Sequence, residues 1–286
     1  MSPTQSHPHS EGEIFPQQSS NVDDYMPAEA RPRRREYSVW DPRSAPGTYL
    51  LLAINIAVYL WMVTHGVDPK DPSEGALLHY GANDTWLVLH GQWYRLLTAT
   101  FVHVGLLHLA TNMWCLWNLG ILGEPLIGPM GMVAVYMLTG IAGNLLSMAS
   151  DVILTLMSRD PRHLLGVGAG ASGAVFGIAG ILIVLLSNRR LPFPWEELRR
   201  LRSSVIKFAG INLVIGLSTA LPFVNFGIRI DNMAHIGGFL SGLALGVPLA
   251  PRMTSGRELY FSRQKITFAA ACFILALFGY WIAFLL

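Results

Sequence analysis

The sequence predicts an all-α polytopic membrane protein, because long charge-free segments alternate with short charged ones. The chain has 286 residues, of which 52% are hydrophobic and only 13% are charged, whereas soluble domains carry about 25% charged residues. Seven charge-free windows are each long enough for a membrane helix of about 20 residues: 44–67, 96–123, 125–150, 163–188, 208–228, 232–251 and 266–286. This pattern excludes a water-soluble protein and a transmembrane β-barrel, whose strands are nearer ten residues and alternate.

Residues 1–46 differ in composition from the rest and are expected to form a disordered cytoplasmic tail. They hold seven of the 17 prolines, together with Ser, Gln, His and acidic residues. Such a stretch buries too little apolar surface to offset its ordering entropy. Its basic run, Arg31, Arg33, Arg34 and Arg35, could bind nucleic acid. Beside a first membrane helix it is better explained as an orientation signal, so no nucleic-acid partner is expected.

The distribution of Lys and Arg predicts a cytoplasmic N-terminus. In that orientation the inner segments are the tail, 122–129, 187–207 and 252–265, which together hold 15 of the 20 basic residues. Basic residues accumulate on the cytoplasmic side of membrane proteins. We therefore expect a multi-pass protein of the cell's inner or plasma membrane, with its C-terminus on the opposite side.

Ser172 lies in a glycine-rich stretch that begins the fourth predicted helix. Glycine is a poor helix former, so residues 166–170 are expected to be irregular and the helix to start near Ala171. Ser172 would then lie in the first turn, where backbone N–H groups lack intrahelical partners and can stabilise an oxyanion. The alternative is a small-residue packing face on which the serine bonds back to its own helix.

His235 lies at a depth that matches Ser172. It follows Asp231 by four residues, which places it about 6 Å into the sixth helix. The fourth and sixth helices run in the same direction, so both side chains are expected near the outer surface, as a nucleophile and its base require. The alternative is a buried histidine bonded to a neighbouring backbone. Asp231 is expected to cap the sixth helix, and a triad role is its second interpretation.

His108 and Asn112 share one face of the second helix, because they stand at i and i+4. Both side chains can donate hydrogen bonds, as an oxyanion hole requires. His103 is expected near the mouth of this site. A haem or metal site of His103, His108 and His235 would lack a carboxylate or thiol cluster. The two cysteines, Cys115 and Cys272, lie in apolar windows far apart in the sequence, so a disulfide framework or a zinc site is not expected either. We therefore expect no metal and no cofactor.

These residues resemble the rhomboid intramembrane serine proteases, over about residues 48–250. Five motifs carry the resemblance in the family's order: Gln92-Trp93-Tyr94-Arg95 of the first loop, His103-x4-His108-x3-Asn112 of the second helix, Gly120-x3-Glu124-x3-Gly128 at its cytoplasmic end, Gly170-Ala171-Ser172-Gly173 around the serine, and Ala234-His235 with Gly238-x3-Gly242 in the sixth helix. Phe176 stands where family members often have a tyrosine that stacks on the histidine.

The resemblance implies a serine endopeptidase that cleaves transmembrane substrates near the outer membrane face. It makes Ser172 the nucleophile and His235 the base, with Asn112, His108 and the Ser172 N–H in the oxyanion hole. The helices around them would pack through Gly170, Gly173, Phe176, Gly238 and Gly242, while Arg95, Gly120, Glu124 and Gly128 would form structural motifs. Helix 208–228 and loop 222–230 would be the gate and cap. Small residues are expected at the cut position.

The resemblance also implies a rhomboid-like six-helix bundle with one extra C-terminal helix. The catalytic core is expected at 47–250, and the linker with the seventh helix at 251–286. A runner-up function is a catalytically silent relative that binds membrane proteins for quality control or trafficking. Such relatives lack the serine or the histidine, and this chain has both. A transporter would need paired intramembrane charges and repeats, which the sequence lacks.

Overall fold

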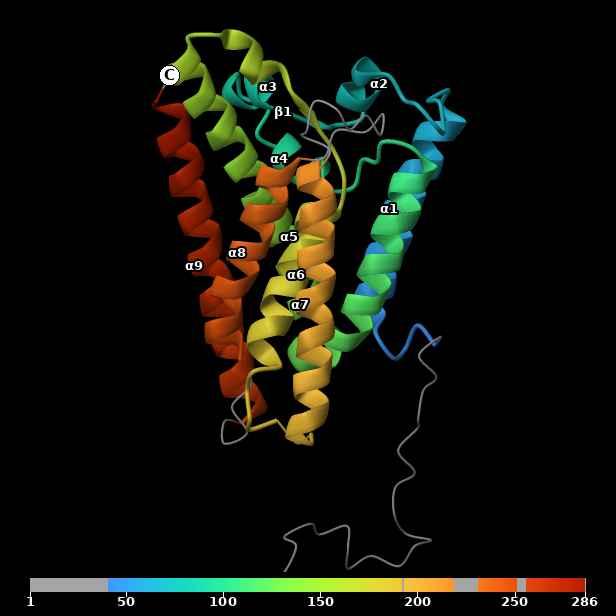
Figure 1. The fold of residues 1–286 in the computed structure, drawn as a ribbon, viewed down its shortest axis with the longest axis vertical. Helices are drawn as coiled ribbons and strands as arrows, with labels where there is room; N and C mark the ends of the chain where they lie inside the picture. The colour runs from blue at the N-terminus through green and yellow to red at the C-terminus, as the bar shows by residue number, and fades with distance from the viewer. Residues whose placement is uncertain (1–40, 192, 219–230, 251–255, 286) are drawn as a thin grey trace, which may run out of the picture. The chain divides into compact units, whose positions relative to one another are not determined.

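The computed structural model describes residues 41–191, 193–218, 231–250 and 256–285. Most of the predicted tail and the whole predicted cap, 222–230, lie outside the described residues. The long helices are α1 (Pro46–Thr64), α5 (Leu106–Ser158), α6 (Ser172–Leu185), α7 (Trp195–Ser218), α8 (Asn232–Leu249) and α9 (Arg257–Ala283). They form a bundle with almost no sheet (Figure 1), so the all-α prediction is confirmed.

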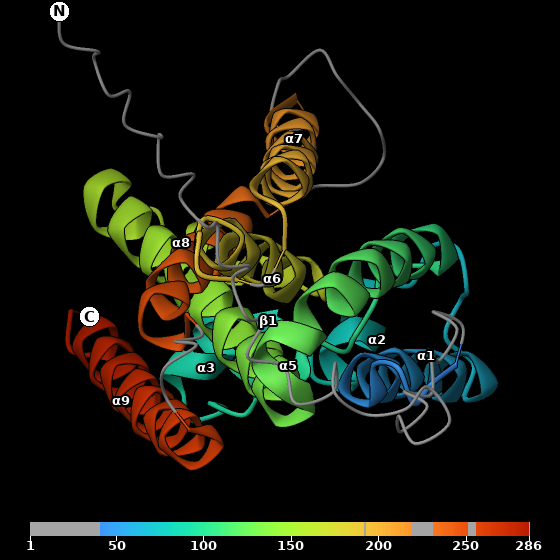
Figure 2. The ribbon, with the colours of Figure 1, turned by 90° about the horizontal axis from the view of Figure 1, so that it is seen from below.

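Helix α5 contains two of the predicted spans. A straight helix of its 53 residues would be about 80 Å long, far more than the roughly 30 Å of a bilayer's hydrocarbon core. The chain turns at Gly128, whose φ of 76° and ψ of 166° are not helical and suit glycine alone. Figure 2 shows the two arms of α5 diverging from this turn.

Glu124 joins the turn of α5 to the start of α1. Its carboxylate is buried and accepts hydrogen bonds from Gly47 N at 2.8 Å, Thr48 N at 2.7 Å and Thr48 Oγ1 at 2.7 Å. A carboxylate at a helix N-terminus satisfies free N–H groups and favours the helix dipole. Gly120 lies directly against the Thr48 side chain. The Gly120–Glu124–Gly128 element therefore fixes α1 against α5.

Helices α6 and α8 pack backbone against backbone at the centre of the bundle. A Cβ on Gly238 would collide with the carbonyl oxygen of Gly173, and one on Gly242 with that of Gly177. Glycine allows such close approach, which is how membrane helices associate without a hydrophobic driving force. These glycines fix the distance between the two helices.

The prediction for the fifth helix is wrong at its start. It was expected to begin at 208, but α7 begins at Trp195. Most of the segment 187–207, which was expected to connect the fourth and fifth helices, is therefore the first half of α7. Leu198 and Val205 in that half are buried, so packing continues the helix beyond its apolar span, while long basic side chains reach polar surroundings. Absence of charge marks where a helix enters the membrane and not where the helix starts.

Short elements between α1 and α5 cover one end of the bundle. They are α2 (Glu74–His79), β1 (Asn83–Asp84), α3 (Thr85–Leu89) and α4 (Arg95–Thr98). Arg95 ties them together, because its guanidinium donates to Leu78 O at 2.7 Å, Ala82 O at 2.8 Å and Gln92 Oε1 at 2.7 Å. The strand β1 pairs antiparallel with β2 (Val167–Gly168), just before Ser172.

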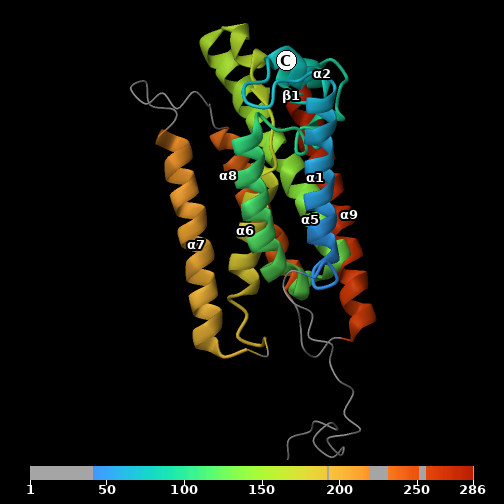
Figure 3. The same ribbon diagram turned by 90° about the vertical axis from the view of Figure 1, so that its right-hand side faces the viewer.

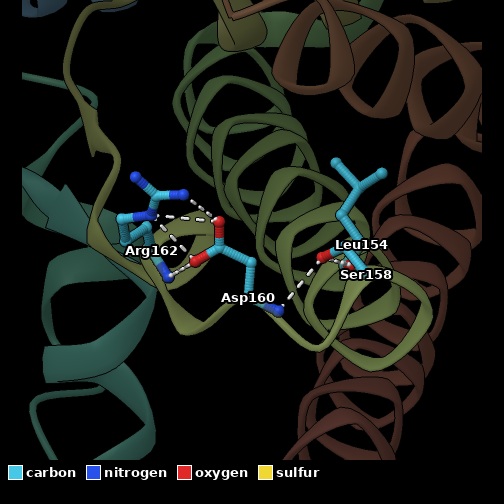
Figure 4. A network of polar contacts seen from close by, with 4 residues as sticks. All are labelled: Leu154, Ser158, Asp160 and Arg162. Atoms are coloured by element: carbon cyan, nitrogen blue, oxygen red, sulfur yellow. Dashed lines mark hydrogen bonds and ion pairs between the residues drawn. The ribbon is translucent and has the colours of Figure 1, made fainter.

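A polar turn follows α5 and leads toward β2 (Figure 4). Ser158 Oγ donates to Leu154 O at 2.6 Å, Asp160 N donates to Ser158 Oγ at 3.2 Å, and Arg162 pairs with Asp160 at 2.6 Å. Hydrogen bonds and charge from Arg162 lower the pKa of the Asp160 carboxyl to about 2. These groups are largely solvent-exposed, so the turn reverses the chain without adding a buried charge.

Among the described residues, three helices are long and apolar enough to cross a membrane by length and composition: α1, α5 and Glu258–Ala283 of α9. Helix α6 is apolar but has only 14 residues, about 21 Å of helix. It is therefore too short to span the hydrocarbon core unaided. Helix α7 lies beside α6 and α8, away from α1 and α9 (Figure 3).

We predict that Glu124→Ala destabilises the fold, because two backbone donors and one hydroxyl lose a buried charged acceptor. Hydrogen bonds to charged groups contribute about 1.5–3 kcal/mol each, so the loss of three of them is expected to cost about 3 kcal/mol or more in thermal unfolding of the detergent-solubilised protein. Glu258→Ala, at an exposed position in the first turn of α9, is the control. Equal melting temperatures for the two variants would contradict the role of Glu124.

Candidate active site

A cavity of about 480 Å³ lies between α5, α6, α7 and α8. It is lined by the four polar residues singled out in the sequence, which are His108, Asn112, Ser172 and His235. Helix α7 contributes Phe208, Asn212 and Ile215 to the opposite wall. The structure therefore brings all four candidates to one cavity, although they come from three separate helices.

Ser172 is the first residue of α6, and the segment before it is held by backbone contacts. Gly170 N donates to Ala99 O at 2.9 Å, and Ala171 N donates to His103 Nε2 at 3.4 Å. Gly170 has a φ of 133°, a conformation that only glycine adopts readily. These contacts direct the chain abruptly into α6, so Ser172 faces the cavity at a helix start.

The start of α6 leaves backbone donors beside Ser172. Its N-cap residue, Ala171, offers no side-chain hydrogen bond to the helix. The first N–H groups of a helix have no intrahelical acceptor, and the helix dipole adds partial positive charge there. No side chain among the described residues caps this turn. Its free N–H groups are therefore suited to stabilise negative charge on a bound carbonyl oxygen.

His235 is buried and is oriented by an aromatic ring. Its imidazole stacks on Phe176 with 4.4 Å between ring centroids and an angle of 17°. Its Nδ1 atom has no hydrogen-bond partner among the described residues. The phenylalanine supplies the ring face expected of this position, so stacking and not hydrogen bonding orients the imidazole from this side.

Asp231 caps α8, as expected. Its Oδ1 accepts from Ala234 N at 2.9 Å, and its Oδ2 accepts from Ser147 Oγ at 2.6 Å. Both carboxylate oxygens are thus engaged away from the imidazole of His235. This geometry favours the capping interpretation over the triad.

His108 presents a donor to the start of α6. Val104 N donates to its Nδ1 at 3.3 Å, so the proton of the neutral ring lies on Nε2. A Cβ built on Gly170 would lie 3.0 Å from that Nε2 atom. The Nε2–H group therefore lies against the segment that precedes Ser172.

Asn112 carries its amide at the cavity wall one turn further along α5. Its Nδ2 donates to His108 O at 3.0 Å, which uses one of the two N–H groups of the amide. The second N–H group remains for a ligand in the cavity.

The expected position of His103 is wrong. It was placed near the mouth, but it is fully buried and lies beneath the segment that precedes Ser172. The reason is that α5 begins only at Leu106, so residues 99–105 form a loop that folds inward. Its ring supports the backbone at Ala171 and donates through Nδ1 to Phe101 O at 3.2 Å. Its spacing from His108 gave no sign of this role.

Further glycines that shape the site lie outside the predicted motifs, although their spacing in the sequence was a detectable signal. Gly180 of α6 lies against Phe239 of α8, and Gly246 of α8 lies against Val184 of α6. Gly177, in contrast, leaves room for Thr139 of α5 on one side and meets Gly242 through its carbonyl. With Gly173, Gly238 and Gly242 they recur mostly at four-residue spacing, which places them on one helix face. Phe208, Asn212 and Ile215 had no such signal, because apolar side chains look alike on every face of a membrane helix.

The remaining predicted motif residues lie outside the cavity. Arg95 organises the covering elements, while Gly120, Glu124 and Gly128 form the turn of α5 and the cap of α1. Among the residues with described positions, no three His, Cys, Asp or Glu side chains are grouped to hold a metal ion.

Helix α7 closes the cavity through contacts with α6 and α8. Phe208 lies near Phe176, with ring centroids 6.5 Å apart, and Asn232 Nδ2 of α8 donates to Gly216 O at 3.2 Å. The first contact covers the ring that stacks on His235. The second joins the end of α7 to the start of α8.

Comparison with known proteins identifies similar sequences over most of the chain. The Rhomboid domain profile matches residues 90–252. The chain is 33% identical over 223 residues to Rhomboid protease GluP of Bacillus subtilis (strain 168). The matched region covers 76% of this chain and 38% of GluP. It is 32% identical over 209 residues to Rhomboid protease AarA of Providencia stuartii, and this matched region covers 70% of this chain and 71% of AarA.

A plant relative shows similar coverage. The chain is 34% identical over 186 residues to RHOMBOID-like protein 5 of Arabidopsis thaliana, which covers 65% of this chain and 53% of that protein. The chain thus matches about two-fifths of GluP, half of the plant protein and more than two-thirds of AarA.

We predict that Gly242→Ala forces α6 and α8 apart, because the new methyl group would overlap the carbonyl of Gly177. Overpacking of this kind costs about 1–3 kcal/mol, measured as a lowered melting temperature. Gly210→Ala in α7 is the control, since nothing lies within 4 Å of a Cβ there and alanine is the better helix former. If both variants melt like the parent, the close packing of α6 on α8 is not required.

Proposed function

The chain belongs to the rhomboid family, and on that basis we propose that it is an intramembrane serine endopeptidase in which Ser172 is the nucleophile and His235 the general base. The observation that carries the proposal is the shared cavity of these two residues with His108 and Asn112. A catalytically silent relative would need neither side chain. The presence of both at one cavity favours the enzyme.

In the proposed reaction, Ser172 Oγ attacks the scissile carbonyl while His235 accepts the hydroxyl proton. The imidazolium then donates this proton to the leaving amine, and water repeats the sequence to release the acyl group. The stack on Phe176 limits rotation of the imidazole. Hydrogen bonds in a catalytic site without substrate are often long and tighten in the Michaelis complex.

The oxyanion of the tetrahedral intermediate would lie at the start of α6. Three donors would serve it: the Ser172 N–H, the second amide N–H of Asn112 and the His108 Nε2–H. Preorganised donors of this kind often provide the largest single contribution to acyl-transfer catalysis. The two neutral side chains add donors without adding a buried charge.

The proposed substrate is a transmembrane protein whose helix unwinds locally at the cavity. A helical backbone has its carbonyl groups hydrogen-bonded, so the scissile bond must leave the helix before attack. Segment 166–171 and the polar cavity wall offer partners for the exposed backbone, and α7 is the wall through which a segment would approach from the bilayer. Small residues at the cut position remain the expectation from the family.

We also propose that the N-terminus is cytoplasmic and that cleavage occurs near the outer face, with residues 47–250 as the catalytic core. The Lys and Arg distribution supports this orientation. The start of α1 and the end of α9 lie at opposite ends of the bundle (Figure 1), as an odd number of spans requires.

We predict that Ser172→Ala lowers cleavage of a transmembrane substrate by a factor on the order of 10⁴ or more. His235→Ala should cause a similar loss, and the double variant should lose no more than either single variant, because the two groups act as a unit. Ser204→Ala, at an exposed position of α7, is the control. Cleavage by Ser172→Ala at the parental rate would remove this serine from the mechanism.

Reporter fusions at both termini test the orientation. A reporter that is active only outside the cytoplasm should be active at residue 286 and silent at residue 1. The opposite result would put the cavity mouth on the cytoplasmic side.

We predict that Asn112→Ala lowers kcat by roughly 10²–10³ and changes KM little, because the lost bond strengthens only as charge develops on the oxygen. Asn118→Ala is a matched control. Asn118 is exposed on the same helix, and its amide bonds to the carbonyl four residues earlier at 2.7 Å, as Asn112 does. A lowered melting temperature with unchanged kcat would show that Asn112 only stabilises the helix.

A further inference from the structure

A cluster of basic side chains lies where α6 and α7 leave the membrane. Six basic residues are found between 187 and 207, against two acidic ones, Glu196 and Glu197, which gives a net charge of +4. The basic residues are Arg189, Arg190, Arg199, Arg200, Arg202 and Lys207. None of them has a role in the cavity or in the proposed reaction.

These side chains are available to an external anion. Arg189, Arg190, Arg199, Arg200 and Lys207 are exposed. The only ion pair recorded among the described residues joins Arg162 and Asp160, at the other end of the bundle, so none of the six pairs with a described carboxylate. Leu198 and Val205 occupy the packed face of α7, and half-buried Arg202 lies between them, while Arg199, Arg200 and Lys207 are exposed.

The cluster lies at the level of the lipid headgroups. The charge-free window that includes α6 ends at Asn188, and the one that includes the second half of α7 begins at Phe208. Both segments therefore leave the hydrocarbon core beside the cluster. Trp195 is half-buried beside the cluster, and tryptophan is enriched at the membrane interface.

Trp195 holds two of the basic side chains in place. Its ring lies under the guanidinium of Arg189 at 4.6 Å and under that of Arg202 at 5.5 Å. Arg202 Nη1 also donates to Ser187 Oγ at 3.1 Å. These contacts join the end of α6 to the start of α7, so the positions of the Arg189 and Arg202 guanidinium groups are fixed by packing.

We propose that this surface binds the headgroups of anionic phospholipids at the base of α7. Four to eight basic residues beside a membrane helix attract anionic lipid, each by about 1 kcal/mol, and guanidinium groups bind phosphate in a bidentate manner. Because α7 also forms a wall of the cavity, bound lipid would anchor the base of that wall. The lipid binding itself does not depend on the proposed proteolysis.

The test is native mass spectrometry of the full chain, released from a neutral detergent that contains equal amounts of dioleoyl phosphatidylglycerol and dioleoyl phosphatidylcholine. The parent protein should retain phosphatidylglycerol in preference to phosphatidylcholine. Arg199→Gln with Arg200→Gln should weaken that retention by about fivefold for each charge removed, or about 25-fold together. An equal concentration of inorganic phosphate should not compete.

The control removes two exposed basic residues elsewhere on the chain, Arg43→Gln with Lys265→Gln. This variant should retain phosphatidylglycerol like the parent. Equal losses in the two double variants would assign binding to diffuse charge and overturn the proposal. So would equal retention of the two lipids, or displacement by phosphate. Melting temperatures equal to the parent's show that each variant is folded, and loss of proteolysis alone would leave the binding proposal intact.

Discussion

The contact of α6 with α8 is the constraint on which the rest of the site depends. Gly238 and Gly242 lie against the carbonyl groups of Gly173 and Gly177, so the two backbones meet without an intervening side chain. Ser172 directly precedes one end of this contact, and His235 lies one turn before Gly238. In lipid, where helices gain little by burying apolar surface against each other, close backbone packing provides the attraction and sets the separation of the two side chains.

The shortness of α6 explains why polar groups are present at this depth. A 14-residue helix leaves part of the membrane thickness to the irregular segment 166–171, and irregular backbone is tolerated there only where protein or a water-filled cavity satisfies it. Pairing with β1, the carbonyl of Ala99 and the ring of His103 provide those partners. The same arrangement leaves the first turn of α6 facing a cavity instead of lipid.

The sequence predicted the features that arise from strong physical costs. Charge-free windows predicted an all-α protein with long apolar helices, because a charge in the bilayer is expensive, and the polar residues inside those windows line one cavity. The start of α7 was missed because Leu198 and Val205 continue a helix through charged sequence. His103 was misplaced because a loop, and not the α5 helix, carries it, and no periodicity describes a loop. Phe208 and Ile215 resemble any other lipid-facing residue until the fold places them.

Intact-protein mass spectrometry after treatment with a fluorophosphonate tests the central claim most directly, because this reagent reacts with a serine only where a base activates it. The account predicts one adduct per chain of folded protein, located on Ser172 by peptide mapping, and no adduct when His235 is replaced by alanine. Labelling of another serine, or labelling of Ser172 that persists without His235, would contradict the assignment of these two residues as nucleophile and base.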